Sequence, residues 1–239
     1  MLAGVRIAAF LVVAPPFSNK AVPGQVKALL AVGLALAVSP RLGDATTTGT
    51  AVFLLDLMLQ AVVGAALGFL VWLVFSAVES AGNLVDLFGG FQMSTAFDPM
   101  SLVNGATFAR LYQGLAVALL VVSGGYQVVL AGMVRSFDAL PLGTQPDLAV
   151  LAHTAGQGLT DMVVAALQIA GPLLVVLFLA DVGLGLLTRV APALNAFALG
   201  FPLKILLTVS LGGMAILTLP GVVTGLVGGA TGALQGVTP

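Results

Sequence analysis

The sequence predicts an all-α integral membrane protein built from long, broken helices, with one loop that re-enters the protein between two of them. The composition supports this class, because 59% of the 239 residues are hydrophobic and only 7% are charged. Soluble domains carry about 25% charged residues, so 8 Lys+Arg and 9 Asp+Glu are too few for a water-exposed surface. A second observation is one polar, glycine-containing stretch, Glu79–Asn104, which lies between long apolar runs.

The sequence carries few features that chemical or nucleic-acid functions need. A net charge of -1 argues against nucleic-acid binding, which requires a basic patch to neutralise phosphates. The chain has no cysteine, which excludes disulfides and cysteine-based metal sites, and its one histidine, His153, is interpreted as a helix residue near the membrane interface. No HExxH, Walker or Ser-His-Asp pattern occurs. We therefore expect a single domain that is not an enzyme and has no catalytic residue, cofactor or metal.

Two short apolar runs open the chain. The first, Leu2–Phe17, is interrupted by Arg6 and ends with Pro15-Pro16. A polar connector, Ser18–Lys27, separates it from the second run, Ala28–Val38. A bilayer-spanning helix needs about 20 apolar residues, so the first run is short for a span.

The run Ala51–Val78 predicts a long helix with one specialised face. Four of its residues recur at steps of four: Asp56, Gln60, Gly64 and Gly68. Positions at this spacing form a ridge that packs against another helix, and Gly64 with Gly68 permits close approach. Asp56 lies about five residues into the run, and we interpret it as solvated rather than as a proton carrier.

The stretch Glu79–Asn104 predicts a loop with a break at each end. Gly89-Gly90 breaks a helix because glycine reaches backbone angles that other residues avoid, and Asp98-Pro99 is a second break. Bulky apolar side chains lie between the breaks: Phe91, Met93 and Phe97. Irregular backbone at membrane depth is tolerated only where it is buried in protein or lines a water-filled cavity, so this loop indicates a passage.

Beyond the loop, Thr107–Val134 predicts another long helix, loosened in its middle by Gly124-Gly125. Arg135–Asp147 is rich in turn residues and predicts a loop. Leu148–Thr160 predicts a mildly polar helix.

The last third of the chain predicts two long helices joined by a turn. The run Asp161–Thr188 contains Pro172, which should kink it, and the final run is Ile205–Gln235. Arg189–Lys204 is too polar and broken to span, and it predicts the turn between these helices. Three residues are expected to fix this turn: Pro192, Asn195 and Pro202.

Five segments resemble, in their order along the chain, the FliR family of flagellar export proteins and the equivalent membrane subunits of virulence-type secretion systems. They are APPFSNKAVPGQVK (14–27), ALGF (66–69), ESAGNLVDLFGGFQMSTAFDP (79–99), SFDALPLG (136–143) and RVAPALNAFALGFPLK (189–204). Together they span most of the chain, from residue 14 to residue 204, and the chain is therefore identified as a member of this FliR/SctT family.

The resemblance implies a subunit of the flagellar type III protein export gate, in the bacterial inner membrane and the flagellar basal body. The partners it implies are FliP, FliQ, FlhB, FlhA, unfolded exported flagellar proteins and membrane lipid, with no nucleic acid. It also implies a FliP-like front part, residues 1–147, and a FliQ-like helical hairpin, residues 148–239. The front part would contain the plug loop of the family, residues 89–104.

The resemblance also implies roles for individual residues. The plug and pore residues are Gly89, Gly90, Phe91, Met93, Phe97, Asp98, Pro99 and Met100. Partner-interface or structural roles fall to Pro23, Lys27, Gly64, Gly68, Pro141, Gly143, Arg189, Pro192, Asn195 and Pro202. Apolar constrictions close pores by excluding water, which suits the large side chains of the loop. The alternative is that these side chains are ordinary packing at a helix junction.

Two other functions stay open at this point. A proton-coupled small-solute transporter is supported by the broken helices and by the acids in apolar runs, although the sequence shows no inverted repeats. A purely structural scaffold differs from an export gate only in whether the loop lines the passage.

Overall fold

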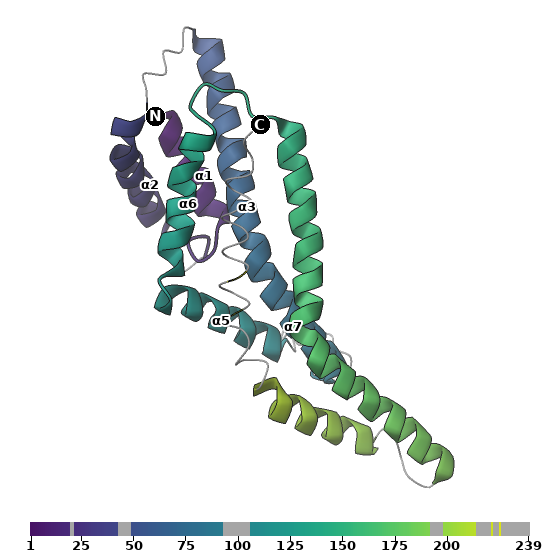
Figure 1. The fold of residues 1–239 in the computed structure, drawn as a ribbon. Helices are drawn as coiled ribbons and strands as arrows, with labels where there is room; N and C mark the ends of the chain where they lie inside the picture. Colours follow the sequence, from purple (N-terminus) through teal and green to yellow (C-terminus); the bar gives the residue numbers. More distant parts are fainter. Residues whose placement is uncertain are drawn as a thin grey trace, which may run out of the picture. The chain divides into compact units, whose positions relative to one another are not determined.

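The computed structural model describes residues 1–19, 22–42, 49–92, 106–191 and 198–213, together with positions 221 and 225. Every regular element in these residues is a helix, as the composition predicts (Figure 1). The chain packs into two compact units. The described residues of the first unit come mainly from 1–75 and 120–161, and those of the second from 76–119 and 162–223. This division follows packing, so the FliP-like and FliQ-like parts stay a prediction.

The first unit is a bundle of helices beside the start of one long helix. It contains α1 (Leu2–Val13), α2 (Gly24–Val38) and the short 3₁₀ helix η1 (Ser39–Arg41). The first half of α3 (Thr50–Phe88) and α6 (Gly125–Ala139) lie beside α1 (Figure 1). The buried residues of α1 recur at helical spacing, as expected of one face on a core: Leu2, Ala3, Arg6, Ile7, Phe10 and Leu11.

The predicted ridge on α3 is the surface on which α1 packs. A Cβ atom on Gly64 would collide with the carbonyl oxygen of Arg6, and one on Gly68 would lie 2.9 Å from that of Phe10. The backbones of α1 and α3 are therefore in contact, and only glycine at these two positions allows it. Gln60, one turn earlier on the ridge, is buried.

Arg6 joins three helices of this unit. Its side chain is only 1% exposed, and its Nε donates to Oε1 of Gln60 on α3 at 2.6 Å. Its Nη1 donates to the carbonyl oxygen of Ser136 at 3.1 Å, and its Nη2 donates to that of Leu140 at 2.8 Å. The guanidinium also lies 4.4 Å from the ring centre of Phe137. The last carbonyls of a helix lack partners in the helix and form its negative end, so a cation is favourable there.

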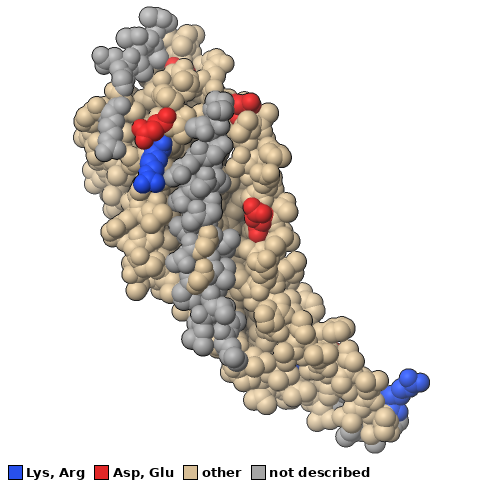
Figure 2. Space-filling model, viewed as in Figure 1, with Lys and Arg blue, Asp and Glu red and all other residues tan. Residues whose placement is uncertain are grey.

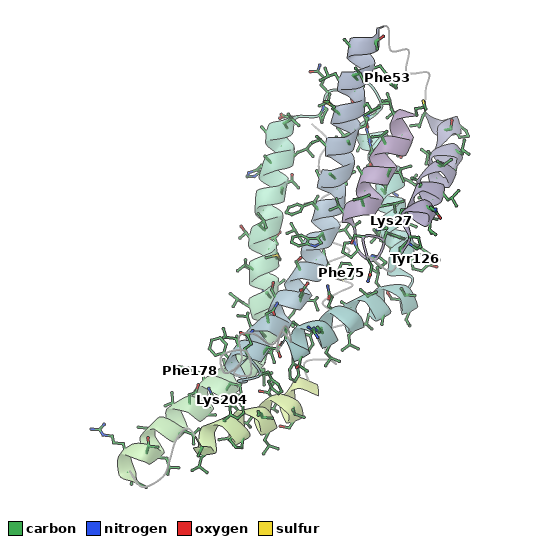
Figure 3. The ribbon with its side chains drawn as sticks, turned by 180° about the vertical axis from the view of Figure 1, so that it is seen from behind. Lys27, Phe53, Phe75, Tyr126, Phe178 and Lys204 are labelled. Carbon is green, nitrogen blue, oxygen red and sulfur yellow. The ribbon has the colours of Figure 1, made fainter. Side chains whose placement is uncertain are left out.

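The second unit contains the end of α3, α5 (Thr107–Val122), most of α7 (Leu148–Val190) and the helix Ala198–Gly213. An ion pair ties the last two of these together, with Lys204 Nζ at 2.7 Å from Asp181 Oδ1. Lys204 lies on the helix Ala198–Gly213, alongside α7 (Figure 3).

The run predicted as one helix from Thr107 is broken into α5 and α6. Gly124 has a φ of 71°, a left-handed conformation that favours glycine, and the two helices bend by 76° at this break. The loop predicted to start at Arg135 starts later, because α6 continues to Ala139. Ser136 and Phe137 are buried, and the contacts of Arg6 hold this last turn.

The two helices predicted on either side of Thr160 are one helix, α7. Asp147 caps its start, since Oδ1 accepts from the backbone N–H of Ala149 at 2.8 Å. Pro172 lies inside α7 without ending it.

The turn predicted from Arg189 to Lys204 is also shorter than expected. Helix α7 continues to Val190, and Pro202 and Lys204 belong to the helix Ala198–Gly213, because an apolar sequence resumes after the Asn-containing segment. Pro202 is therefore a helix residue rather than a turn residue. Positions 192–197, which include Pro192 and Asn195, lie outside the described residues.

Two described helices, α3 and α7, are long and apolar enough to cross a membrane, and the bent pair α5–α6 is a third candidate span if it counts as one. On the face drawn in Figure 2, few side chains are charged. Helices of this length and composition, on a surface with so few charges, are those of a membrane protein.

Replacing Arg6 should loosen the first unit. In Arg6→Leu, the carbonyl of Leu140 loses its buried donor, at a cost of about 1–3 kcal/mol for an unsatisfied group, whereas the carbonyl of Ser136 still accepts from the backbone N–H of Leu140. Thermal unfolding of the purified chain in detergent measures this loss. Arg135→Leu changes an exposed arginine of α6 and should alter stability by no more than about 0.5 kcal/mol. Equal effects of the two substitutions would contradict this role of Arg6.

Candidate functional site

The predicted helix break at Gly89-Gly90 is confirmed. Helix α3 ends at Phe88, and Gly90 has a φ of 84°, the left-handed region that other residues rarely adopt. The loop is shorter at its start than the stretch Glu79–Asn104 suggested, because the residues up to Phe88 continue α3. No glycine or proline after Gly82 interrupts that part of the helix.

The structure describes only the start of the predicted plug. Gly89, Gly90 and Phe91 are described, and positions 93–105 are not. The other predicted plug residues therefore lie outside the described residues: Met93, Phe97, Asp98, Pro99 and Met100.

Asp86 ties the two ends of this loop together. It is fully buried, at 0% exposure, on the last turn of α3. Its Oδ1 accepts from the backbone N–H of Phe108 at 2.9 Å, and its Oδ2 accepts from that of Ala109 at 3.0 Å. These are N–H groups of the first turn of α5, which have no partner within that helix. A carboxylate is favourable at this positive helix end, so Asp86 caps the helix that follows the loop.

Further contacts at the base of the loop reinforce this junction. The backbone N–H of Phe91 donates to the carbonyl oxygen of Asp86 at 3.0 Å. The ring of Phe91 meets that of Phe108 edge-on, with centres 5.2 Å apart, and Phe108 meets Tyr112 in the same way at 6.1 Å. A Cβ atom on Gly82 would lie 2.5 Å from Cα of Ala109, so α3 and α5 touch through their backbones.

The helix Ala198–Gly213 covers the same junction. A Cβ atom on Gly89 would lie 2.7 Å from Thr208 Oγ1, and one on Gly90 would lie 3.2 Å from the ring of Phe201. The base of the loop is therefore held between three helices of the second unit. We call this set of contacts, centred on Asp86, the loop anchor.

The remaining predicted residues lie at helix ends and helix contacts. Pro23 immediately precedes α2, and Lys27 is half-buried on α2 (Figure 3). Pro141 and Gly143 form a turn after α6, in which Gly143 has a φ of 85° and Thr144 Oγ1 donates to the carbonyl oxygen of Pro141 at 2.7 Å. Arg189 lies in the last turn of α7. None of these residues contributes to the loop anchor, and of the predicted residues that the structure describes, only Gly89, Gly90 and Phe91 belong to it.

Sequence reasoning missed the two buried charged residues, Arg6 and Asp86. The available signals were an arginine inside an apolar run and an aspartate one turn before a glycine pair. Neither signal identifies a partner. Asp181 lies within an apolar helix, where a charge is costly in lipid, and its ion pair with Lys204 reduces that cost within the chain.

Comparison with known proteins matches nearly the whole chain to one protein family. The model of the family described as bacterial export proteins, family 1, matches residues 1–230. The chain is similar to the flagellar biosynthetic protein FliR of Escherichia coli strain K12, with 34% identity over 210 residues, 87% of this chain and 80% of that protein. It shares 26% identity with FliR of Bacillus subtilis strain 168 over 86% of this chain and 81% of that protein. The surface presentation of antigens protein SpaR of Shigella sonnei is 29% identical over 63% of this chain and 58% of its own length.

Weakening the loop anchor should expose the start of α5. Asp86→Asn leaves one acceptor oxygen for two buried N–H groups, which costs about 1–3 kcal/mol for the group that loses its partner. We expect faster hydrogen exchange at the amides of Phe108 and Ala109 than in the unmodified chain. Asp138→Asn, at an exposed acid of α6, should leave these two amides unchanged. Unaltered exchange in the Asp86 variant would show that the carboxylate does not hold α5.

Proposed function

Because the chain belongs to family 1 of the bacterial export proteins, we propose that it is a membrane subunit of the flagellar type III protein export apparatus. In this proposal it lies in the inner membrane at the flagellar basal body. With FliP and FliQ it forms the channel through which unfolded flagellar proteins are exported, next to FlhB and FlhA. The observation that carries the proposal is the match over residues 1–230, supported by similarity to FliR proteins over most of their length.

The loop that begins at Gly89 is proposed to be the plug of this channel. A channel wide enough for an unfolded chain must not leak ions at rest, and apolar constrictions close pores by excluding water. The loop anchor supports this role, because it fixes both ends of the loop at one place. Phe91 at its start already packs against Phe108 in the anchor. The proposed seal consists of Phe91 with Met93, Phe97 and Met100.

The proposed role requires no catalytic residue, cofactor or metal. The acids whose contacts are described are engaged in holding helices together. Both oxygens of Asp86 accept backbone N–H groups, and Asp181 pairs with Lys204. These arrangements support packing rather than proton transfer, and so they favour an export subunit over a proton-coupled transporter.

The FliQ-like part, residues 148–239, is proposed to be the hairpin of α7 and the helix Ala198–Gly213. The ion pair of Asp181 with Lys204 supports this pairing. Many large apolar side chains on this hairpin are exposed, including Phe178 (Figure 3). Such side chains are buried against lipid or partner subunits in a membrane assembly. The surfaces of the chain that face partner subunits are proposed to be shaped by the remaining predicted residues: Pro23, Lys27, Pro141, Gly143, Arg189, Pro192, Asn195 and Pro202.

The plug proposal predicts a leak when its large side chains are removed. Truncating Phe91, Met93 and Phe97 together to Ala should widen the constriction and admit water, because a dewetting seal depends on side-chain volume and apolarity. The measurement is ion flux across membranes that contain equal amounts of assembled complex and no engaged substrate. The triple variant should show a higher resting flux than the unmodified complex.

Phe91→Leu and Met93→Leu are the matched controls, since they nearly keep volume and apolarity and should leak much less. The amount of assembled complex must be the same in all samples, as expected if the flanking helices keep their packing. An equal resting flux in the triple variant and the unmodified complex would mean that these residues are ordinary packing.

A further inference from the structure

Two hydroxyl groups of the second unit are buried without a hydrogen-bond partner. They belong to Tyr112 on α5 and Thr208 on the helix Ala198–Gly213, and each residue is 0% exposed. In the part of the chain that the structure describes, these are the two buried side-chain groups without a partner. By contrast, the hydroxyl of Ser210, on the same helix as Thr208, donates to the carbonyl oxygen of Leu206 at 2.6 Å. The two unpaired hydroxyls therefore need an explanation of their own.

Thr208 faces the point at which α3 ends. A Cβ atom on Gly89 would lie 2.7 Å from Thr208 Oγ1, and it would lie at the same distance from the carbonyl oxygen of Val85. That carbonyl accepts from the backbone N–H of Gly89 at 2.8 Å. The hydroxyl therefore lies beside a carbonyl whose hydrogen bond holds the last turn of α3. If the N–H of Gly89 moves away, the hydroxyl can donate to that carbonyl in its place.

Tyr112 has a similar position at the start of α5. It lies one turn after Phe108 and Ala109, whose backbone N–H groups donate to the carboxylate of Asp86. The rings of Tyr112 and Phe108 meet edge-on, with centres 6.1 Å apart. Long side chains on a helix point toward its N-terminus, so the hydroxyl of Tyr112 extends toward the end of α5 at which Asp86 accepts these two bonds.

An unpaired buried hydroxyl raises the free energy of the packed state. In water, or beside an acceptor that has lost its donor, the same hydroxyl is hydrogen-bonded, so this penalty disappears when the surrounding contacts separate. Both hydroxyls lie at the loop anchor, since Thr208 contacts Gly89 and Tyr112 packs on Phe108. They therefore lower the free energy needed to open the anchor locally, whereas the hydrogen bonds of Asp86 raise it.

We propose that Tyr112 and Thr208 are positioning residues whose unpaired hydroxyls make the loop anchor easier to open. The opening is local: backbone N–H groups at the end of α3 and the start of α5 leave their acceptors, the two hydroxyls gain partners, and the helices stay packed through their remaining contacts. Such an opening releases the ends of a loop that must make way for an exported chain, and this link to export rests on the proposed function.

Tyr112→Phe and Thr208→Val test the proposal, because each removes a hydroxyl and nearly keeps the shape of the side chain. Hydrogen exchange is measured on the purified full chain in detergent. In Tyr112→Phe, exchange at the amides of Phe108 and Ala109 should slow by about five- to hundredfold, the range that corresponds to the cost of one unpaired buried group. In Thr208→Val, the same slowing is expected at the amide of Gly89. The Tm of each variant should be unchanged or higher.

Tyr126→Phe and Thr154→Val are the matched controls in the first unit. The hydroxyl oxygen of Tyr126 accepts from Gln127 Nε2 at 3.2 Å, and the hydroxyl of Thr154 donates to the carbonyl oxygen of Val150 at 2.9 Å. Because these hydroxyls have partners, their removal should not slow exchange at the loop anchor. If exchange at the anchor amides is unchanged or faster without an anchor hydroxyl, that hydroxyl carries no penalty in the packed state, and the inference is overturned for that residue.

The link to export is tested in cells that make each variant in place of the unmodified chain. At equal amounts of assembled complex, Tyr112→Phe and Thr208→Val should export flagellar proteins more slowly than the unmodified chain, and Tyr126→Phe should not. Slower hydrogen exchange together with unchanged export would overturn the role of the two hydroxyls in export. Absence of export with the unmodified chain would instead count against the proposed function.

Discussion

The buried guanidinium of Arg6 is the interaction on which the first unit depends. Burying a charge is costly unless it is paired and hydrogen-bonded, and no carboxylate contacts Arg6 among the described residues. Its charge is instead compensated by the carbonyl end of α6, by the amide oxygen of Gln60 and by the ring face of Phe137. Because these partners belong to different helices, the buried guanidinium loses hydrogen bonds if α1 moves away from α3 or α6.

In the second unit, Asp86 accepts hydrogen bonds from backbone N–H groups, whereas Arg6 donates to backbone carbonyls. The carbonyls that Arg6 contacts are at the end of α6, and the N–H groups that Asp86 contacts are at the start of α5. In both cases the buried end of one helix is satisfied by a charged side chain from another. Where water is scarce, backbone groups must find their partners within the protein, and helix ends are the places where such partners are missing. Few charged residues are therefore enough, provided that they contact helix ends.

In the proposed function, the loop that begins at Gly89 closes the export channel, and the loop anchor gives it a fixed base. The loop anchor fixes the start of the loop and the start of α5 through Asp86, Phe91 and Phe108. The close backbone contact at Gly82 keeps the two flanking helices together. A firm base of this kind is what the proposed plug requires, because the helices on either side of the loop stay packed through contacts that do not involve the loop.

Local patterns in the sequence predicted the fold class, the α3 ridge and the break at Gly89, since each depends on composition, periodicity or glycine. The same patterns predicted the wrong helix ends where contacts between distant residues determine how far a helix continues. Exposed polar residues near Thr160 suggested a helix boundary, yet polar side chains facing outward do not end a helix, and α7 continues.

The site was predicted less completely than the fold. Arg6 meets backbone atoms 130 and 134 residues away, and Asp86 meets the start of α5 22 residues away. Spacing along the chain gives no sign of such partners, because a backbone carbonyl or N–H group is present at every position except the N–H of proline.

The central claim is that Arg6 acts through its partners on α3 and α6 rather than through its own bulk. A double-mutant cycle tests it most directly, with Arg6→Met, Gln60→Leu and the double variant, and with the free energy of unfolding measured in detergent. The claim predicts that the double variant is more stable than the sum of the single losses by at least about 1 kcal/mol, because the two side chains share one buried hydrogen bond. Losses that add within about 0.5 kcal/mol would show that Arg6 and Gln60 act independently, and would contradict the claim.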